Sequence, residues 1–137
     1  MMTDTYAANN MQGMLMQKQI LVVDDEMVMR SLVAIAMQRQ GYNVTQMDNP
    51  YKALAYFDQS VPDLIILDLM MPGMSGTEFC RRIRERSVTA DVPIIIFSAR
   101  DDDWQIKEAI DAGATAYLYK LQPSCDLVEM VNNLLAE

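Results

Sequence analysis

The sequence predicts an α/β fold in which five parallel strands form one doubly wound sheet with helices on both faces. Three observations support this. Strand-like and helix-like segments alternate five times along the chain. Three of the strand-like segments are almost wholly apolar, as strands covered on both faces are. The chain has 137 residues, 51% of them hydrophobic, which is enough for one domain with a proper core.

Five short runs rich in aliphatic and β-branched residues are predicted to be strands. The first, third and fourth are nearly continuous apolar runs and should be fully buried, whereas the second contains polar residues and should be half-buried. In chain order, the predicted strands are residues 19–23, 42–45, 63–67, 92–97 and 115–119.

Five segments with helical periodicity follow these strands. Their ends carry helix signals: Gly41 and Gly113 in stop positions, Pro50 in a first turn, and Asp101, Asp102 and Asp103 where acids suit the macrodipole. The first and third predicted helices are residues 27–40 and 76–86. The second begins at Pro50, and its residues Ala53, Leu54 and Phe57 share a face; the fourth begins at 101–103 and stops before Gly113. The last helix has Leu127, Val131 and Leu134 at core spacing.

Composition narrows the functional classes. A net charge of -8 argues against direct binding to nucleic acid or to an anionic membrane, and no apolar run is long enough to span a bilayer. The chain has no histidine, which excludes His-based catalysis and a phosphohistidine carried by this chain. Cys80 and Cys125 have no metal-like spacing, so we expect reduced thiols and a cytoplasmic location. Residues 1–17 are expected to be a flexible leader without signal-peptide character, and residues 18–137 to be the domain.

Polar side chains follow the buried strands at the points where these strands end. Asp24 and Asp25 follow the first strand, Asp68 the third and Lys120 the fifth, and Ser98 ends the fourth. The carboxyl ends of parallel strands meet at one edge, which is where ligands bind in open α/β sheets. Carboxylates favour Mg²⁺, with Asp25 and Asp68 as its ligands and Asp24 in an outer or water-bridged role. A carboxylate can also attack phosphorus, in which case Lys120 and Ser98 would contact the phosphoryl oxygens.

With these residues in this order, the chain resembles the receiver domain of two-component response regulators, and in particular a stand-alone, chemotaxis-regulator-like one. The matching segments are Val-Val-Asp24-Asp25-Glu26, Leu-Ile-Ile-Leu-Asp68-Leu-Met-Met-Pro-Gly-Met-Ser-Gly76, Ile-Ile-Ile-Phe-Ser98-Ala and Gly-Ala-Thr-Ala-Tyr117-Leu-Tyr-Lys120. The resemblance implies a flavodoxin-like (βα)5 fold with strand order 2-1-3-4-5.

The resemblance also implies a function, namely a phosphoacceptor switch. Asp68 would take a phosphoryl group from a histidine kinase or phosphotransfer protein, and the chain would catalyse only its own phosphorylation and dephosphorylation. Mg²⁺, with Mn²⁺ as a substitute, would be held by Asp25, Asp68 and the main-chain carbonyl of Met70, with Asp24 reached through water. Ser98 and Tyr117 would be the switch pair that alters the surface of the fourth helix, fifth strand and fifth helix for a downstream protein target, or in a phosphorylation-dependent dimer.

One position departs from the family pattern. Most receivers have a proline directly after the lysine, joined by a cis peptide, and here Leu121 stands in that place. Because a non-proline cis bond costs about 3–4 kcal/mol, we expect a trans, or otherwise a strained cis, Lys120–Leu121 bond and a shifted loop before the last helix. That shift would affect the reach of Lys120.

Several alternatives stay open at this point. One alternative is a pseudo-receiver, a structural interaction module that keeps the fold but is not phosphorylated. An aspartyl-phosphate phosphohydrolase is less consistent, because such enzymes need an acid where Met70 stands. A solvated, ion-paired helix face is the expected role of four arginines, Arg81, Arg82, Arg84 and Arg86. Three methionines are expected either to line exposed helix surface or to fill gaps in the core, namely Met27, Met29 and Met37.

Overall fold

The computed structural model describes residues 17–121 and 124–136, so the predicted leader lies almost wholly outside the described residues. Strands and helices alternate as predicted. The elements are β1 (Gln19–Val23), α2 (Met27–Arg39), β2 (Asn43–Met47), α3 (Pro50–Tyr56), β3 (Leu64–Leu67), α4 (Gly76–Glu85), β4 (Ile94–Ser98), α5 (Asp103–Asp111), β5 (Ala116–Tyr119) and α6 (Ser124–Leu135). In the described residues, no helix is long and apolar enough to cross a membrane.

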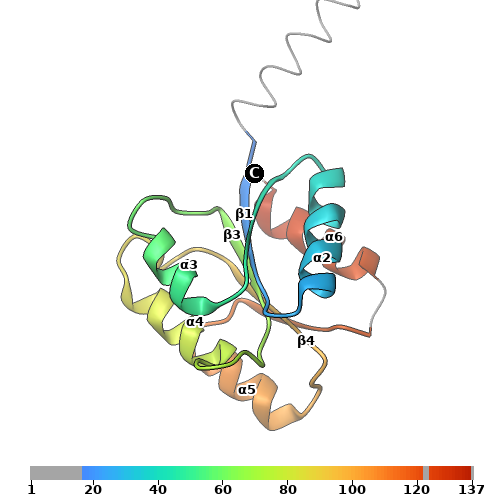
Figure 1. The fold of residues 1–137 in the computed structure, drawn as a ribbon. Helices are drawn as coiled ribbons and strands as arrows, with labels where there is room; N and C mark the ends of the chain where they lie inside the picture. Colours follow the sequence, from blue (N-terminus) through green and yellow to red (C-terminus); the bar gives the residue numbers. More distant parts are fainter. Residues whose placement is uncertain (1–16, 122–123, 137) are drawn as a thin grey trace, which may run out of the picture.

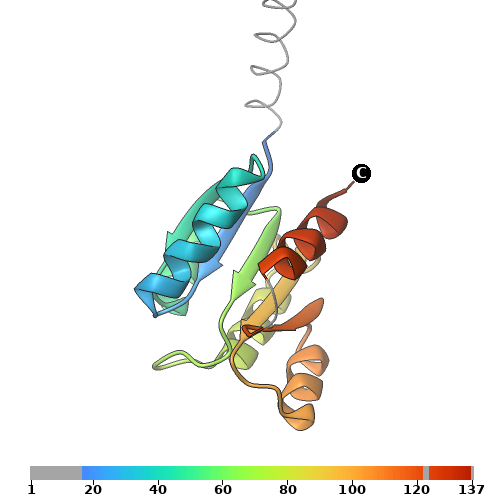
Figure 2. The same cartoon turned by 90° about the vertical axis from the view of Figure 1, so that its right-hand side faces the viewer.

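The five strands form one parallel sheet in the order β2-β1-β3-β4-β5, which confirms the predicted fold class. Helices α2 and α6 cover one face of this sheet, and α3, α4 and α5 cover the other (Figures 1 and 2). The pairing of Val23 with Leu67 brings the ends of β1 and β3 level, and β4 runs two residues beyond Ile96, the partner of Leu67. Residues that follow these strands therefore emerge at one edge of the sheet.

Two apolar layers hold the helices on the sheet. Side chains alternate along each strand, because successive residues of a strand point to opposite faces. Thus Leu21 and Ile65 pack beneath α3, α4 and α5, whereas Ile20 and Ile66 pack beneath α2 and α6. Strands β1, β3 and β4 are almost wholly buried, and this fits their continuous apolar runs.

Local signals explain where most helices begin and end. Asn49 caps α3 by accepting a hydrogen bond from Lys52 N at 2.8 Å, and Ser75 caps α4 by accepting one from Glu78 N at 3.2 Å. Gly41 follows α2 with a φ of +93°, a conformation that favours glycine. Strand β2 runs two residues further than predicted, because Val22 and Val23 of β1 pair with Gln46 and Met47.

The methionines of α2 divide between the two explanations offered for them, exposed surface and core filling. Met27 is exposed and Met29 is partly buried, but Met37 is completely buried in the layer beneath α2 and α6. Helix α2 is apolar on both its faces, so the sequence pattern alone did not select the buried one.

Arg84 is also not part of a solvated basic face. Its guanidinium donates hydrogen bonds to the main-chain carbonyl oxygens of Val92 (2.6 Å), Gly113 (2.9 Å), Ala90 (3.1 Å) and Thr89 (3.2 Å). One side chain on α4 thereby joins the loop before β4 to the loop before β5. The neighbouring Arg82 behaves as expected and pairs with Glu78 at 3.3 Å, half exposed.

Replacement of Arg84 by methionine is expected to lower the free energy of unfolding by about 2–3 kcal/mol, because several carbonyl groups lose their donor together. The matched change on the exposed face of the same helix, Arg82→Met, should cost about 0.5 kcal/mol or less, since surface ion pairs contribute little. Urea unfolding of both variants measures this loss of free energy, and the dependence of the unfolding free energy on urea concentration should stay unchanged. Equal midpoints for the two variants would contradict the structural role of Arg84.

Candidate functional site

The acidic pair after β1 divides into one buried and one exposed carboxylate. The Asp24 side chain is only 6% exposed, and its Oδ1 accepts a hydrogen bond from Glu26 N at 2.9 Å. The main chain of Asp24 is held by its neighbours, because Asp24 N donates to Met47 O at 3.1 Å and Arg30 Nη1 donates to Asp24 O at 2.8 Å. Asp25 is exposed. No signal in the sequence indicates that Arg30 belongs to the site. This residue lies within α2 and not at a strand end, and its guanidinium contacts a main-chain oxygen.

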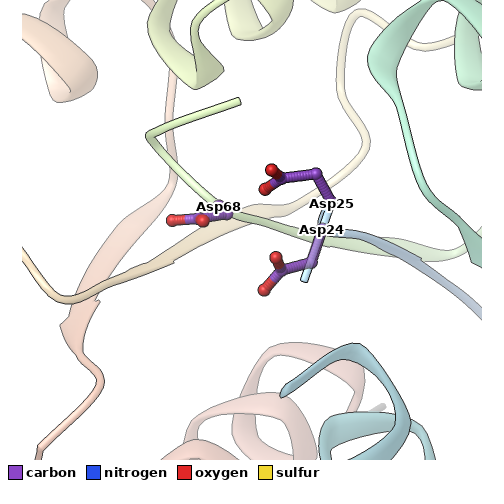
Figure 3. Close-up of side chains that lie close together, drawn as sticks. All are labelled: Asp24, Asp25 and Asp68. Atoms are coloured by element: carbon purple, nitrogen blue, oxygen red, sulfur yellow. The ribbon is translucent and has the colours of Figure 1, made fainter. Parts of the chain in front are cut away.

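Asp68 follows β3 and is buried beside this pair. Its main-chain nitrogen donates to Val23 O at 3.1 Å, and its Oδ1 accepts a hydrogen bond from Met70 N at 3.4 Å. Carboxylate oxygens of Asp24, Asp25 and Asp68 lie within 4.8 Å of one another. Figure 3 shows the three side chains gathered where β1 and β3 end. Carboxylate oxygens so close together repel unless a cation lies among them, and oxygen donors are the ligands that Mg²⁺ prefers.

The loop after Asp68 is held by two hydrogen bonds, one that joins its ends and one near its middle. Gly76 N donates to Leu69 O at 2.7 Å, and the Tyr51 hydroxyl on α3 donates to Gly73 O at 3.1 Å. Met70 lies between these two contacts, and its side chain is 54% exposed. The predicted metal ligand, the main-chain carbonyl of Met70, therefore belongs to a loop held on two sides. Tyr51 was not anticipated, because nothing in its sequence context indicates a contact with a loop 22 residues away.

Lys120 enters the acidic cluster from β5. Its Nζ lies 3.1 Å from Asp24 Oδ2 and 3.4 Å from Asp68 Oδ2, and its side chain is only 8% exposed. Lys120 N donates to Ser98 O at 2.7 Å, so the lysine is placed by main-chain pairing with β4. The reach of Lys120 is thus intact although Leu121 replaces the usual proline.

The Lys120–Leu121 peptide is trans, since no bond between described residues is cis. This confirms the first of the two forms expected for that bond. Leu121 is 78% exposed at the rim of the site. The expected shift of the following loop falls on residues 122–123, which lie outside the described residues.

Burial raises the pKa of the Asp68 carboxyl, and this is the largest influence on it. The ammonium of Lys120 lowers this pKa, and the negative charge of Asp24 raises it again. The net effect is a raised pKa of Asp68, so ionisation of this carboxyl destabilises the folded protein relative to the unfolded chain. A divalent cation or a transferred phosphoryl group would change that balance.

In the metal-free protein this cost is expected to appear as a pH dependence of stability. A carboxyl whose pKa is raised on folding binds more protons in the folded state, so its contribution is fully present below the ordinary pKa of aspartate and is lost as pH rises through the raised value. The stability of Asp68→Asn relative to wild type should therefore increase across that range and then level off. Urea unfolding at a series of pH values, with EDTA present, measures the difference. A flat or falling Asp68→Asn difference would be contrary to this expectation.

Ser98 and Tyr117 meet through the backbone of Arg100. Ser98 Oγ is buried and accepts a hydrogen bond from Arg100 N at 3.1 Å, while the Tyr117 hydroxyl donates to Arg100 O at 2.6 Å. Burial raises the pKa of Tyr117; Ser98 opposes this rise, and the charge of Asp68 adds to it. The loop between β4 and α5 is therefore tied to both proposed switch residues.

A small cavity of about 290 Å³ opens beside these groups. It is lined by Glu26, Met29, Asp68, Met70, Ser98, Ala99, Arg100, Lys120 and Leu121. A carboxylate, a hydroxyl and an ammonium face the same space, while much of the rim is apolar. The structure thus brings together the residues that the sequence placed at strand ends, and the cavity adds Glu26, Met29 and Ala99, which sequence reasoning did not select.

Comparison with known proteins gives one consistent result. Residues 20–132 match the family described as the response regulator receiver domain. The phosphate regulon transcriptional regulatory protein PhoB of Pseudomonas aeruginosa is 36% identical over 118 residues, which cover 86% of this chain and 52% of that protein. SphR of Synechococcus elongatus, an alkaline phosphatase synthesis transcriptional regulatory protein, is 38% identical over 85% of this chain and 48% of its own. The chain thus spans about half the length of these curated relatives.

Solved structures agree with the sequence matches. The chemotaxis protein CheY4 of Vibrio cholerae has a TM-score of 0.82 and 29% identity, with 87% of this chain and 99% of that chain covered. A protein from Chloroflexus aurantiacus, described as a putative response regulator, has a TM-score of 0.83 and 30% identity, with 88% of this chain and 99% of that chain covered. Both are matched over nearly their whole length.

Proposed function

The chain belongs to the response regulator receiver domain family, and on that premise we propose that it is a phosphoacceptor switch whose acceptor is Asp68. The observation that carries the proposal is the position of Lys120 Nζ, buried between Asp24 Oδ2 and Asp68 Oδ2 at 3.1 and 3.4 Å. A buried ammonium beside a carboxylate nucleophile supplies the positive charge that an incoming phosphoryl group requires.

In the proposed reaction, a carboxylate oxygen of Asp68 attacks the phosphorus atom. A bond forms between this oxygen and phosphorus while the bond from phosphorus to the donor breaks, and the donor leaves with that electron pair. The donor is the phosphohistidine of a histidine kinase or phosphotransfer protein. Lys120 and Ser98 contact the phosphoryl oxygens, the first as a cation and the second as a hydroxyl donor.

The acidic cluster fits a divalent cation, because it offers only oxygen donors and carries more negative charge than Lys120 balances. Asp25, Asp68 and the carbonyl of Met70 would hold Mg²⁺, or Mn²⁺ in its place, with Asp24 reached through water. The bound cation would screen the two anions that must approach each other.

The proposed output is a change in the surface formed by α5, β5 and α6. The Ser98 hydroxyl would turn toward the phosphoryl group and release Arg100 N, and Tyr117 would then exchange its hydrogen bond to Arg100 O for an inward position. Such a shift between two arrangements alters the affinity of a downstream protein, or of a second phosphorylated copy. We infer a regulatory role in the cytoplasm, with catalysis limited to the chain's own phosphorylation and dephosphorylation.

Incubation of the purified protein with acetyl phosphate and Mg²⁺ tests this proposal. We expect intact-mass spectrometry to show one added phosphoryl group, with none added when EDTA replaces Mg²⁺. Intrinsic fluorescence of Trp104, which is exposed at the start of α5, provides a second readout of the change near the site. A folded protein that gains no phosphoryl mass under these conditions would leave a pseudo-receiver, an interaction module without phosphorylation, as the better description.

A further inference from the structure

Helix α2 presents an apolar stripe on the side that faces away from the sheet. Val28, Leu32 and Ile35 follow one another at helical spacing and are 62%, 56% and 45% exposed. The opposite side of the same helix is buried through Val33 and Met37. A second apolar stripe on a helix, opposite the one that faces the core, often marks a surface that another segment covers. Within residues 17–121 and 124–136, no other element packs over this stripe.

The N-terminal segment joins the fold beside the end of this helix. Gln17 Nε2 donates to Gly41 O at 2.7 Å, and Asn43 N donates to Lys18 O at 2.9 Å. Gly41 follows the C-terminal end of α2, and Ile35 lies six residues before it, about 9 Å along the helix axis. The segment that precedes Gln17 therefore starts next to the near end of the stripe.

The composition of that segment suits the stripe. Residues 11–16 contain Met11, Met14, Leu15 and Met16, and the only charged side chain in residues 1–16 is Asp4. In an extended chain, Met11 and Met14 would be about 10 Å apart, the same distance as from Val28 to Ile35 on the helix. Methionine side chains adapt well to an apolar surface of irregular shape.

We propose that residues 11–16 of this chain dock along the α2 stripe, parallel to the helix, with Met14 near Ile35 and Met11 toward Val28. An attached segment acts at an effective concentration of about 1 mM, which favours it over a second copy of the chain at micromolar concentration. The stripe begins shortly after Asp25 in sequence, so the docked segment would flank the acidic site.

Disulfide trapping in the full chain tests the docking without any phosphorylation. The background is Cys125→Ser, because Cys125 is exposed, whereas Cys80 is completely buried. One variant combines Met14→Cys with Ile35→Cys. The matched variant combines Met14→Cys with Val61→Cys, because Val61 is 42% exposed and lies two residues before Asp63, whose Oδ2 accepts a hydrogen bond from Gln19 N at 2.7 Å. Val61 is thus similarly exposed and close to the same exit of the chain.

We expect the Met14–Ile35 pair to form an intrachain disulfide several-fold faster than the Met14–Val61 pair under mild oxidation. Addition of Leu32→Asp to the first variant should reduce its rate to that of the second. Equal rates for the two pairs would overturn the proposal, since an undocked segment would reach both sites. A disulfide-linked dimer whose yield rises with protein concentration would also overturn it and assign the stripe to a second copy.

Discussion

Replacement of Asp68 by asparagine is expected to abolish phosphoryl uptake from acetyl phosphate. The amide has nearly the shape of the carboxyl, so its oxygen can still accept the hydrogen bond from Met70 N, and the fold should persist. The variant lacks the anionic oxygen of residue 68 that attacks phosphorus in the proposed reaction. Intact-mass spectrometry after incubation with acetyl phosphate and Mg²⁺ measures the effect.

Two comparisons make this result specific to Asp68. Asp91→Asn removes an exposed carboxyl that precedes β4 at the opposite edge of the sheet, and it should accept a phosphoryl group as fast as wild type. Lys120→Gln should slow uptake without moving the phosphoryl group to another residue, because the lysine only balances charge. If Asp68→Asn gains the same mass as wild type, then the acceptor is another side chain and the proposed mechanism is wrong.

The strand-end residues were predictable because parallel strands impose a simple geometry. The apolar runs that end at Val23, Leu67 and Phe97 predict buried strands, and the polar residue that follows each run must emerge at the same edge. The observed register confirms this, since Val23 pairs with Leu67 and Leu67 with Ile96. Fold class and the juxtaposition of the acidic residues follow from this rule.

Contacts between elements distant in sequence were not predictable in the same way. Asp24 and Asp25 are adjacent in the sequence, and only the packed structure shows that Asp24 contacts Lys120 while Asp25 is exposed. Arg84 has the sequence context of a solvated helix charge, yet its guanidinium donates hydrogen bonds to two loops that the fold brings together. Helical periodicity also could not separate Met37 from Leu32, because α2 is apolar on both sides.

The second large effect concerns Gly76, whose α-carbon packs against the backbone that carries Asp68. A methyl group added at Gly76 would overlap the main-chain carbonyl oxygen of Asp68 and would lie 2.8 Å from Leu69 Cα and 2.9 Å from Leu67 Cδ1. Two of these neighbours are backbone atoms of the segment that leaves β3, and they cannot turn aside as a flexible side chain would. Gly76 N also donates to Leu69 O at 2.7 Å, which fixes this approach.

Gly76→Ala is therefore expected to lower the free energy of unfolding by about 3 kcal/mol, at the upper end of the cost of overpacking. Helix propensity alone predicts the opposite sign, because alanine favours the helical conformation more than glycine does. Urea unfolding separates these expectations. Phosphoryl uptake should also slow in the fraction that remains folded, since the Asp68 and Leu69 backbone must move to admit the methyl group.

Gly41→Ala is the control that separates instability from displacement of the site. Gly41 has a φ of +93° and no atom within 4 Å of the added methyl group, so its cost is conformational, about 1–2 kcal/mol, and lies far from Asp68. We expect Gly41→Ala to be destabilised yet to accept phosphoryl groups at the wild-type rate below its unfolding midpoint. If both variants lose uptake in proportion to stability, the close approach at Gly76 supports only the fold. If Gly76→Ala loses uptake while still folded and Gly41→Ala does not, the approach positions Asp68 for the reaction.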